Sequence, residues 1–382
     1  MSRAPATRFG DLRSLVRRPP TPEVWATLCA LLDEASGAER ADALVPYAEH
    51  HIAHWPAQLR IAPTTWLARM AHGEHMPELR LVRRVVGYDF TRDRFAALTQ
   101  SRQLRHIVEL SARHSQLTDE GPVLVAQATH LEHLRALDLS STHMTPRGLR
   151  ALVHAQHLGE LRRLCISSNP LGEGVAALAR ARNLPKLERL DVARANLGPM
   201  GAEALVQGRG LEGVRALDIS GNAMGDEGVE LLFEDGTLSR VQELDLKSNR
   251  VTDLGAAVLA NAPTLAEVRR LVLFDNAISA AGVTALGSGR HLVLLEELDL
   301  GSNQLGDAGA IALASAPQLY GLTHLKLAHN RIGPGGILAL ASAPHLSTLQ
   351  QLDVRRNPIE DEGLQALRQS QYLRDTKIVF EE

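Results

Sequence analysis

The sequence predicts an α/β solenoid, in which short strand–turn–helix units stack side by side, because three features recur at a fixed interval. Apolar residues alternate with polar ones, as in the segments VQELDL and LEELDL that begin at Val241 and Leu295. An asparagine comes three residues after each of these segments, at Asn249 and Asn303, and a glycine comes six residues after the asparagine, at Gly255 and Gly309. The 382 residues are 45% hydrophobic and 22% charged, so the chain can bury a core and is not disordered by composition.

Ten repeats share the pattern LxxLxLxxNxL at a period of 27 residues, with a single spacing of 26. Their first residues are Ile107, Leu134, Leu161, Leu187, Val214, Val241, Val268, Leu295, Leu322 and Leu349. The third repeat is one residue short, and the fourth has Ala195 where the asparagine belongs. These departures either are tolerated within the array, which we favour, or disturb the stacking between residues 161 and 200.

Each repeat is expected to supply one strand, one turn and one short helix. The apolar fourth and sixth places, such as Leu244 and Leu246, indicate a strand with one buried face. Asp or Thr in the turn can cap the helix, and a glycine occupies the fifteenth place in nine repeats. Because helices are wider than the ~4.8 Å between strands, the stack is expected to bend into a horseshoe, with a parallel sheet on the concave side and helices on the convex side.

The ninth place of most repeats is an asparagine, whose amide can both donate and accept. We expect these residues to form a structural ladder rather than a ligand site, because they satisfy backbone groups exposed where the chain leaves the strand. The ladder comprises Asn169, Asn222, Asn249, Asn276, Asn303, Asn330 and Asn357.

The region before the repeats has a different composition. Residues 1–20, rich in arginine, are expected to be a disordered arm, and residues 21–105 an α-helical capping domain that holds every tryptophan. Thr21 is the predicted N-cap of its first helix, with Pro22 in the first turn. Residues 106–382 are the repeat domain, and residues 374–382 form a half-repeat whose strand closes the stack.

The N-terminal segment, the two cysteines and the catalytic motifs that the sequence lacks indicate the cellular location and the class of protein. The N-terminus lacks the apolar run of a secretory signal, and Cys29 and Cys165 lie far apart, so we expect free thiols and a cytoplasmic protein. An organellar transit peptide is the less favoured alternative. No phosphate loop, nucleophile elbow or thiol-enzyme signature is present, so the sequence predicts neither an enzyme nor a cofactor.

Histidines near the N-terminus are the only candidate metal ligands. His50 and His54 are spaced to share one helix face, with His51 beside them, and His72 and His75 form an HxxH pair. The pattern lacks HExxH and an assignable carboxylate ligand. We therefore predict no metal site and favour a structural role, with a zinc-dependent activity as an alternative.

The fifth place of the repeats carries carboxylates along the expected concave face. Asp191, Asp218, Asp245 and Asp299 belong to this row. Their mutual repulsion could be offset by neighbouring arginines such as Arg189. Two interpretations remain open, a structural role, which we favour, and an acidic docking strip for a basic partner.

Two further features distinguish this face. Phe274 is expected to project between Lys247 and Gly301, with Asp275 nearby, either as an interface anchor or lying over its neighbours. Towards the C-terminus a basic end is expected, in contrast to the acidic middle. Its residues are His324, Lys326, His329, Arg331, Arg355 and Arg356.

The repeats resemble leucine-rich repeats of the ribonuclease-inhibitor-like class, which includes the Ran GTPase-activating proteins. The resemblance rests on the LxxLxLxxN motif, the 27-residue period and the glycine with its Ala-Leu helix, and covers residues 107–373. It implies a horseshoe that presents a binding surface and no fixed chemistry. It also suggests, as an alternative function, a regulator of a small GTPase. The 37 arginines against four lysines suggest a bacterial source.

These observations predict a monomeric, non-enzymatic interaction protein that binds another protein in its concave groove. With 41 Lys+Arg against 44 Asp+Glu, nucleic acid is not expected as a partner, and the absence of an 18-residue apolar run argues against a membrane. The predicted partner-binding residues are Asp191, Asp218, Asp245, Phe274, Asp275, Asp299, His324, Lys326, His329, Arg331, Arg355 and Arg356.

Overall fold

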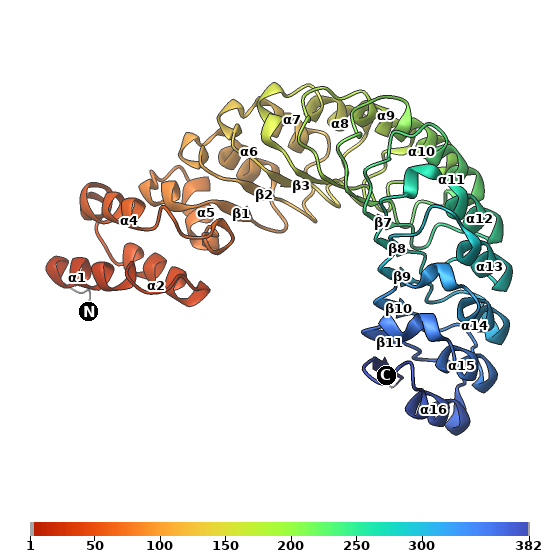
Figure 1. Ribbon diagram of the computed structural model, residues 1–382. Coiled ribbons are helices and arrows are strands. Elements are labelled where there is room, and N and C mark those ends of the chain that lie inside the picture. Colours follow the sequence, from red (N-terminus) through yellow and green to blue (C-terminus); the bar gives the residue numbers. More distant parts are fainter. Residues whose placement is uncertain (1–3, 381–382) are drawn as a thin grey trace. The chain divides into compact units, whose positions relative to one another are not determined.

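The computed structural model describes residues 4–380, and the chain divides into two compact units. The first unit runs to Cys165 and includes Asn183–Lys186, and the second comprises Ile166–Arg182 and continues from Leu187. The division falls within the third repeat, which is the one that is a residue short. In both units, strands and helices alternate along the chain to form an α/β solenoid (Figure 1).

The first unit begins with helices that precede the repeats. The Thr21 hydroxyl accepts from the Val24 N–H at 3.3 Å, so α2 begins at the N-cap that the sequence indicates. Trp66 is fully buried and Trp25 nearly so, which gives this region its own core. The elements are α1 (Pro5–Leu15), α2 (Pro22–Asp33), α3 (Gly37–Glu39), the π-helical η1 (Arg40–Leu44), α4 (Val45–His51), the 3-10 turn η2 (Ala57–Leu59), α5 (Thr64–Ala71) and the 3-10 turn η3 (Pro77–Leu81).

The disordered arm expected over residues 1–20 differs from the structure, which has helix α1 at Pro5–Leu15. Leu12 is fully buried, and the Arg8 guanidinium pairs with the Glu39 carboxylate. Two buried leucines and one ion pair therefore anchor a segment whose arginine-rich composition resembles that of a solvated arm.

Four parallel strands in the first unit carry repeats. They are β1 (Arg84–Val86), β2 (Glu109–Ser111), β3 (Ala136–Asp138) and β4 (Arg163–Cys165), each followed by helical segments. These segments are α6 (Arg92–Gln100), η4 (Arg102–Leu104), α7 (Glu120–Gln127), η5 (Thr129–Leu131), α8 (Pro146–Leu152) and η6 (Gln156–Glu160).

Strand β1 corrects the boundary of the array, because it lies inside residues 21–105, for which the sequence predicts an α-helical capping domain. Arg84 pairs in parallel register with Glu109, which is 25 residues away rather than 27. Phe90 stands where the asparagine belongs, and its N–H donates to the Ser115 hydroxyl at 2.9 Å. The altered spacing and the missing amide hide this repeat from a search at the regular period.

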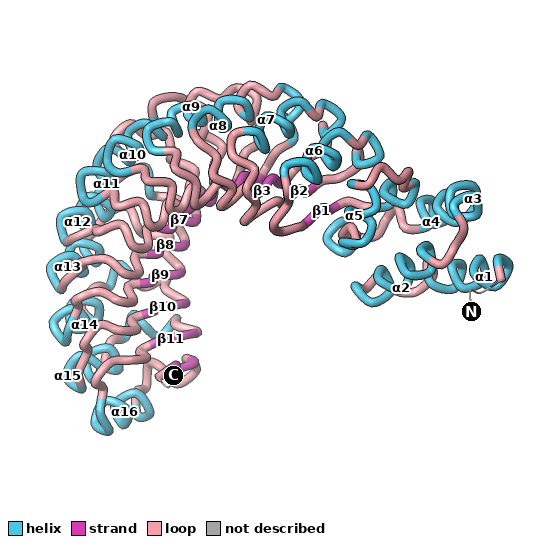
Figure 2. Tube along the Cα trace, turned by 180° about the vertical axis from the view of Figure 1, so that it is seen from behind, coloured by secondary structure: helices cyan, strands magenta, loops and turns pink. Residues whose placement is uncertain are grey.

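The second unit has eight parallel strands on one side and helices on the other (Figure 2). The strands are β5 (Arg189–Asp191), β6 (Ala216–Asp218), β7 (Glu243–Asp245), β8 (Arg270–Val272), β9 (Glu297–Asp299), β10 (His324–Lys326), β11 (Gln351–Asp353) and β12 (Lys377–Val379). The last of these pairs with β11, at the place where the sequence predicts the strand of the half-repeat.

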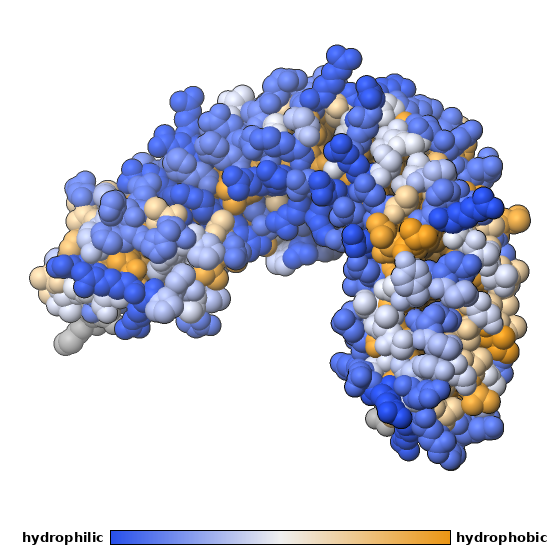
Figure 3. All heavy atoms as spheres, viewed as in Figure 1, coloured by the Kyte–Doolittle hydropathy of each residue, from blue (hydrophilic) through white to orange (hydrophobic). Residues whose placement is uncertain are grey.

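The helical segments of the second unit lie behind this sheet. They are η7 (Gly172–Val175), α9 (Ala176–Ala179), α10 (Gly198–Val206), α11 (Gly225–Phe233), α12 (Asp253–Asn261), η8 (Pro263–Leu265), α13 (Ala280–Ser288), α14 (Gly306–Ala314), η9 (Pro317–Leu319), α15 (Pro334–Ala341), η10 (Pro344–Thr348) and α16 (Glu360–Gln369). Apolar side chains also reach the surface on this side, including Ile311 and Leu338, and Figure 3 shows apolar atoms over α14 and α15.

The core of each repeat lies between its strand and its helix. Leu244 and Leu246 are both 0% exposed, as the alternation in the sequence requires. A row of asparagine amides joins neighbouring repeats beside this core. Asn222 donates from Nδ2 to the carbonyl oxygens of Val192 and Ile219, and its Oδ1 accepts the Ala195 N–H at 2.8 Å. Each such amide satisfies buried backbone groups of two repeats at once.

Ala195 interrupts this ladder, and its backbone takes over one of the bonds that the missing amide would make. The backbone carbonyl of Ala195 accepts the N–H groups of Leu171 and Gly172 at 3.1 and 3.0 Å. In regular repeats, an Asn Oδ1 accepts the equivalent of the first of these bonds, as Asn276 does from Val251 N. The third repeat also has a 3-10 turn and a four-residue helix in place of one longer helix.

A second row of carboxylates links the helices. Asp253 in α12 accepts from the Ser279 N–H at 2.7 Å, the Ser279 hydroxyl at 2.6 Å and the Gly282 N–H at 2.8 Å. The aspartate thus caps the helix of the following repeat rather than its own. Glycine is required at place 15 because a Cβ on Gly282 would lie 2.5 Å from Asp253 Oδ1 and 2.8 Å from Ile278.

Candidate functional site

The sheet side of the second unit carries most of the side chains predicted to bind a partner. We define the sheet face as the third, fifth, seventh and eighth places of the repeats from β5 to β11. The middle residue of each strand is buried, and its two neighbours point to the opposite side, as strand geometry requires. In-register parallel pairing brings Asp191, Asp218 and Asp245 into one row.

The carboxylates of this acidic row have a structural task. Asp191, Asp218, Asp245, Asp299 and Asp353 each accept, on Oδ1, the N–H of the residue two positions later, at 2.9–3.1 Å. These bonds hold the turn that leaves each strand. The structural interpretation thus accounts for one oxygen of each carboxylate. Burial, together with the charge of Asp218, raises the pKa of Asp245.

The arginines expected to offset this row make ion pairs elsewhere on the sheet face. Arg189 reaches across one strand to Glu243, with Nη2 2.6 Å from Oε2, and Arg270 pairs with Glu297 at 3.3 Å. Arg270 also lowers the pKa of Asp245 by its charge, although burial outweighs it. This row of Arg–Glu pairs at the third place was missed, although the alternation of Arg and Glu there is visible in the sequence.

Phe274 lies in the middle of the sheet face. The Lys247 Nζ lies 4.8 Å from the centroid of its ring, which is the distance of a cation–π contact. On the other side, a Cβ built on Gly301 would lie 2.7 Å from the ring, so the aromatic side chain covers the glycine backbone. Phe274 is therefore held in place by both neighbours while it remains partly exposed.

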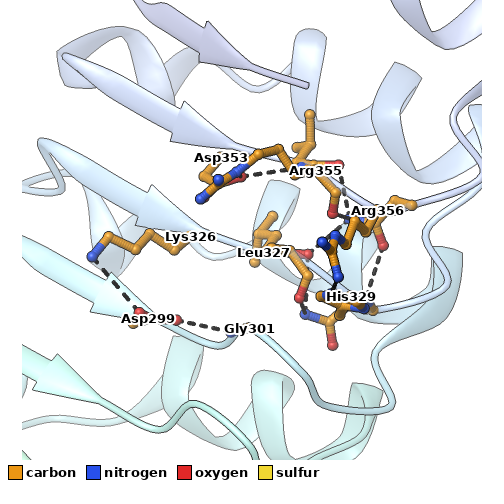
Figure 4. Close-up of polar contacts among 12 residues, drawn as sticks. Asp299, Gly301, Lys326, Leu327, His329, Asp353, Arg355 and Arg356 are labelled. Atoms are coloured by element: carbon orange, nitrogen blue, oxygen red, sulfur yellow. Dashed lines mark hydrogen bonds and ion pairs between the residues drawn. The ribbon is translucent and has the colours of Figure 1, made fainter. Parts of the chain in front are cut away.

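Beyond Phe274, two cations of the basic end, Lys326 and Arg355, form ion pairs with carboxylates of the acidic row (Figure 4). Lys326 Nζ lies 3.7 Å from Asp299 Oδ2, and Arg355 Nη2 lies 2.7 Å from Asp353 Oδ2. Although burial opposes it, the Arg355 side chain holds the pKa of Asp353 below its ordinary value. The expected contrast of an acidic middle with a basic end is thus reduced, because two of the cations are neutralised locally.

The remaining predicted residues lie near the turn after each strand. Asp275, His329 and Arg356 occupy the eighth place, where the backbone is left-handed with φ of 55–58°. Asp275 accepts from the Ser248 hydroxyl at 2.6 Å, and Arg356 Nη1 lies 3.2 Å from His329 Nε2. Arg331 is exposed two residues further on, beyond the sheet face, and His324 Nδ1 lies 2.9 Å from the Thr323 hydroxyl.

The N-terminal histidines do not converge. His51 stacks on Tyr47 with ring centroids 4.0 Å apart, and His50 lies edge-on to His51 at 5.0 Å. His72 contacts the Ala68 carbonyl, and His75 contacts Gln103. Within residues 4–380, no group of three or more His, Cys, Asp or Glu side chains is placed to hold a metal ion.

Comparison with known families agrees with this geometry. Seven segments match the Leucine Rich repeat family, at residues 130–153, 183–206, 214–233, 240–260, 291–314, 322–341 and 345–367. This is a leucine-rich repeat protein. Its leucine-rich repeats therefore extend through both units. No curated protein matches the sequence.

Two of the solved structures to which the chain is similar are complexes of other proteins. The chain is similar to one in the complex of Rad7 and Elc1 in yeast, with a TM-score of 0.52 and 17% identity over 96% of this chain and 87% of that chain. It is also similar to the mouse RP105/MD-1 complex, with a TM-score of 0.48 and 23% identity over 74% of this chain and 44% of that chain. The leucine-rich repeat protein thus spans less than half of that relative.

A third likeness is to an internalin from Listeria monocytogenes, with a TM-score of 0.43 and 18% identity over 85% of this chain and 96% of that chain. At these identities, the likeness to the Rad7 and Elc1 structure supports the fold and nothing finer. No helix among residues 4–380 combines the length and the apolar character needed to cross a membrane.

Proposed function

We propose that this leucine-rich repeat protein is a non-enzymatic scaffold that binds a partner protein on the sheet face. The observation that carries the proposal is the fixed position of Phe274, partly exposed between Lys247 and Gly301. Leucine-rich repeats generally serve as protein-interaction scaffolds, and an aromatic side chain held in one conformation loses little entropy on binding.

The charge around Phe274 supports a partner with a basic surface. The second unit carries 27 Asp+Glu against 19 Lys+Arg, so it is acidic despite its local cations. Asp191, Asp218 and Asp245 lie side by side in one row on this face, and all three are partly exposed. Such a row favours association with a basic partner and increases its rate.

The class of the repeats and the cellular location of the protein are further parts of this proposal. A helix in most repeats supports the ribonuclease-inhibitor-like class, and Cys29 and Cys165, which form no disulfide with each other, support a reducing, cytoplasmic location in a bacterial cell. We propose a monomer that binds neither nucleic acid nor membrane. The GTPase-regulator and zinc alternatives stay predictions of the sequence.

Affinity capture from the native host tests the proposal. Phe274→Ala is expected to lower recovery of the partner at least tenfold, because it removes an interface anchor. The double variant Lys326→Glu with Arg355→Glu, which reverses two charges of the basic end, is expected to change the amount of partner recovered as well. Matched controls are Tyr320→Ala, an exposed aromatic residue off the sheet face, and Arg368→Glu on α16, which are expected to leave recovery unchanged. Equal recovery with all four variants would show that the sheet face is not the binding surface.

A further inference from the structure

A cavity of about 490 Å³ opens on the first unit, where the ends of α6 and α7 meet the turns η4 and η5. Its polar lining comes from Gln100, Arg102, Arg105, Gln127, Thr129 and His130. The volume lies in the range of small-molecule sites and well above that of a single ion. Leu124 and Ala128 add apolar surface to the same walls.

The cavity concentrates positive charge that no carboxylate balances. Arg102 and Arg105 are exposed, and neither forms an ion pair within residues 4–380. The one side-chain bond of Arg105 goes to His106, whose pKa is lowered by burial and by the charges of Arg83 and Arg105. Elsewhere in the first unit, Arg84 and Arg163 both pair with Glu109. This site therefore differs from the paired arginines around it.

His130 adds an unsatisfied group to the wall. Its Nε2 is buried and has no hydrogen-bond partner, whereas the ring bonds to the Ser101 backbone. Burial, together with the charges of Arg102 and His157, lowers the pKa of His130, so the ring is neutral at pH 7. An anion beside Nε2 would favour the protonated ring, in which both nitrogens donate.

We propose that this cavity binds a small organic phosphate monoester. Two guanidinium groups with two carboxamides and a hydroxyl match the acceptor oxygens of a phosphate, and the apolar walls accommodate its organic group. A dianion fits better than a carboxylate, because both arginines are uncompensated. The first unit as a whole is basic, with 22 Lys+Arg against 17 Asp+Glu.

Calorimetric titration of the full chain with phenyl phosphate, benzoate and inorganic phosphate tests this site. Phenyl phosphate is expected to bind more tightly than the other two probes, and Arg102→Ala and Arg105→Ala to weaken it at least tenfold. Arg150→Ala, an exposed arginine of α8 outside the cavity, is the matched control and is expected to bind as the parent does. Binding that is undetectable, equal for benzoate, or unchanged in the two cavity variants would overturn the proposal.

The role of His130 has a separate readout. Inorganic sulfate keeps a constant charge near and below neutrality, so its affinity is expected to rise as the pH falls below about 6.5, because the pKa of His130 lies below that ordinary value for histidine and the ring gains its proton there. His130→Gln, which keeps a polar side chain, is expected to remove this dependence. An equal rise in the variant would exclude His130 from the site.

Discussion

At the scale of single residues, the ladder amides do more for the fold than their size suggests. Asn249 is fully buried, donates from Nδ2 to the Ile219 carbonyl oxygen at 3.0 Å, and accepts the Asn222 N–H on Oδ1 at 3.0 Å. These partners belong to the preceding repeat. A single amide therefore holds two strands in register, and its backbone partners have no access to water.

Replacing Asn249 with Ala is expected to destabilise the protein by about 1–3 kcal/mol, because the buried Asn222 N–H would lose its acceptor and the Ile219 carbonyl oxygen would keep only the bond from Asn222 Nδ2. The free energy of unfolding in urea measures the change. Asn261→Ala is the matched control, since this asparagine is exposed at the end of α12 and bonds only within its own helix. A loss for Asn249→Ala no larger than that of the control would contradict the ladder's role.

The residue scale also shows where sequence reasoning reaches its limit. The place of Phe274 between Lys247 and Gly301 follows from the repeat register alone. The partner of Arg189 does not, because its side chain passes over Ala216 to reach Glu243 two strands away. The rotamer of a long side chain determines which of several neighbours it contacts, and the repeat period does not predict the rotamer.

At the scale of elements, several helices depend on an aspartate of the preceding repeat for their cap, among them α8, α12 and α13. Although burial would raise it, the pKa of Asp253 is held below its ordinary value by bonds from Ser279 and Gly282. Because the folded-state pKa is the lower one, this contact stabilises the fold above about pH 4, and the stabilisation is lost as the pH falls through the folded-state value.

Asp253→Asn is expected to lower the free energy of unfolding by about 1 kcal/mol at pH 7, as loss of a helix cap does. The difference from the parent is expected to shrink as the pH is lowered towards 3, where the parent's carboxyl is protonated as well. Urea titrations across this pH range measure both values. For Glu227→Gln, an exposed acid of α11, no pH-dependent difference is expected, and a constant difference for Asp253→Asn would refute the linkage.

Two elements could not be predicted because their signals are local. Strand β1 escapes a periodic search because it lies 25 residues before β2 and is followed by Phe90. Helix α1 depends on contacts with α2 and on the Arg8–Glu39 pair, which its own composition does not reveal. By contrast, the positions of the regular strands, the asparagine ladder and the closing strand could be predicted from the period. Each repeat buries the same places of the pattern against its neighbours.

At the scale of the whole molecule, a repeat array lacks a closed core, so its last strand determines how the sheet ends. Strand β12 covers β11, where Val354 donates to the Val379 carbonyl oxygen at 2.8 Å and Lys377 donates to that of Gln350 at 2.8 Å. Without β12, the edge of the sheet would move to β11, and the core around Leu352 and Val354, which are now fully buried, would be uncovered, so that association with another chain is favoured.

Deleting residues 374–382 is therefore expected to cost on the order of 2 kcal/mol and to cause concentration-dependent self-association. Sedimentation velocity at several concentrations, together with urea unfolding, measures both effects. Lys377→Ala, which keeps the strand, serves as the control and is expected to sediment like the parent. Identical sedimentation and stability of the shortened chain would mean that β12 does not protect the edge.

The amide ladder constrains how such a protein can change in length over evolution. Its bonds join residues that lie 27 positions apart, as between Asn222 and Asn249, so copying or losing a complete repeat leaves every remaining bond intact. An insertion between the strand and the asparagine would break the series at that point. The repeat that is one residue short has its irregular segment at Gly172–Ala179, on the helical side, and the ninth place that follows is Ala195, which bonds to Leu171 and Gly172 through its backbone carbonyl instead of through an amide side chain. This hydrogen-bond pattern is therefore compatible with changes in length by duplication or loss of whole repeats, and with small insertions or deletions within the helices.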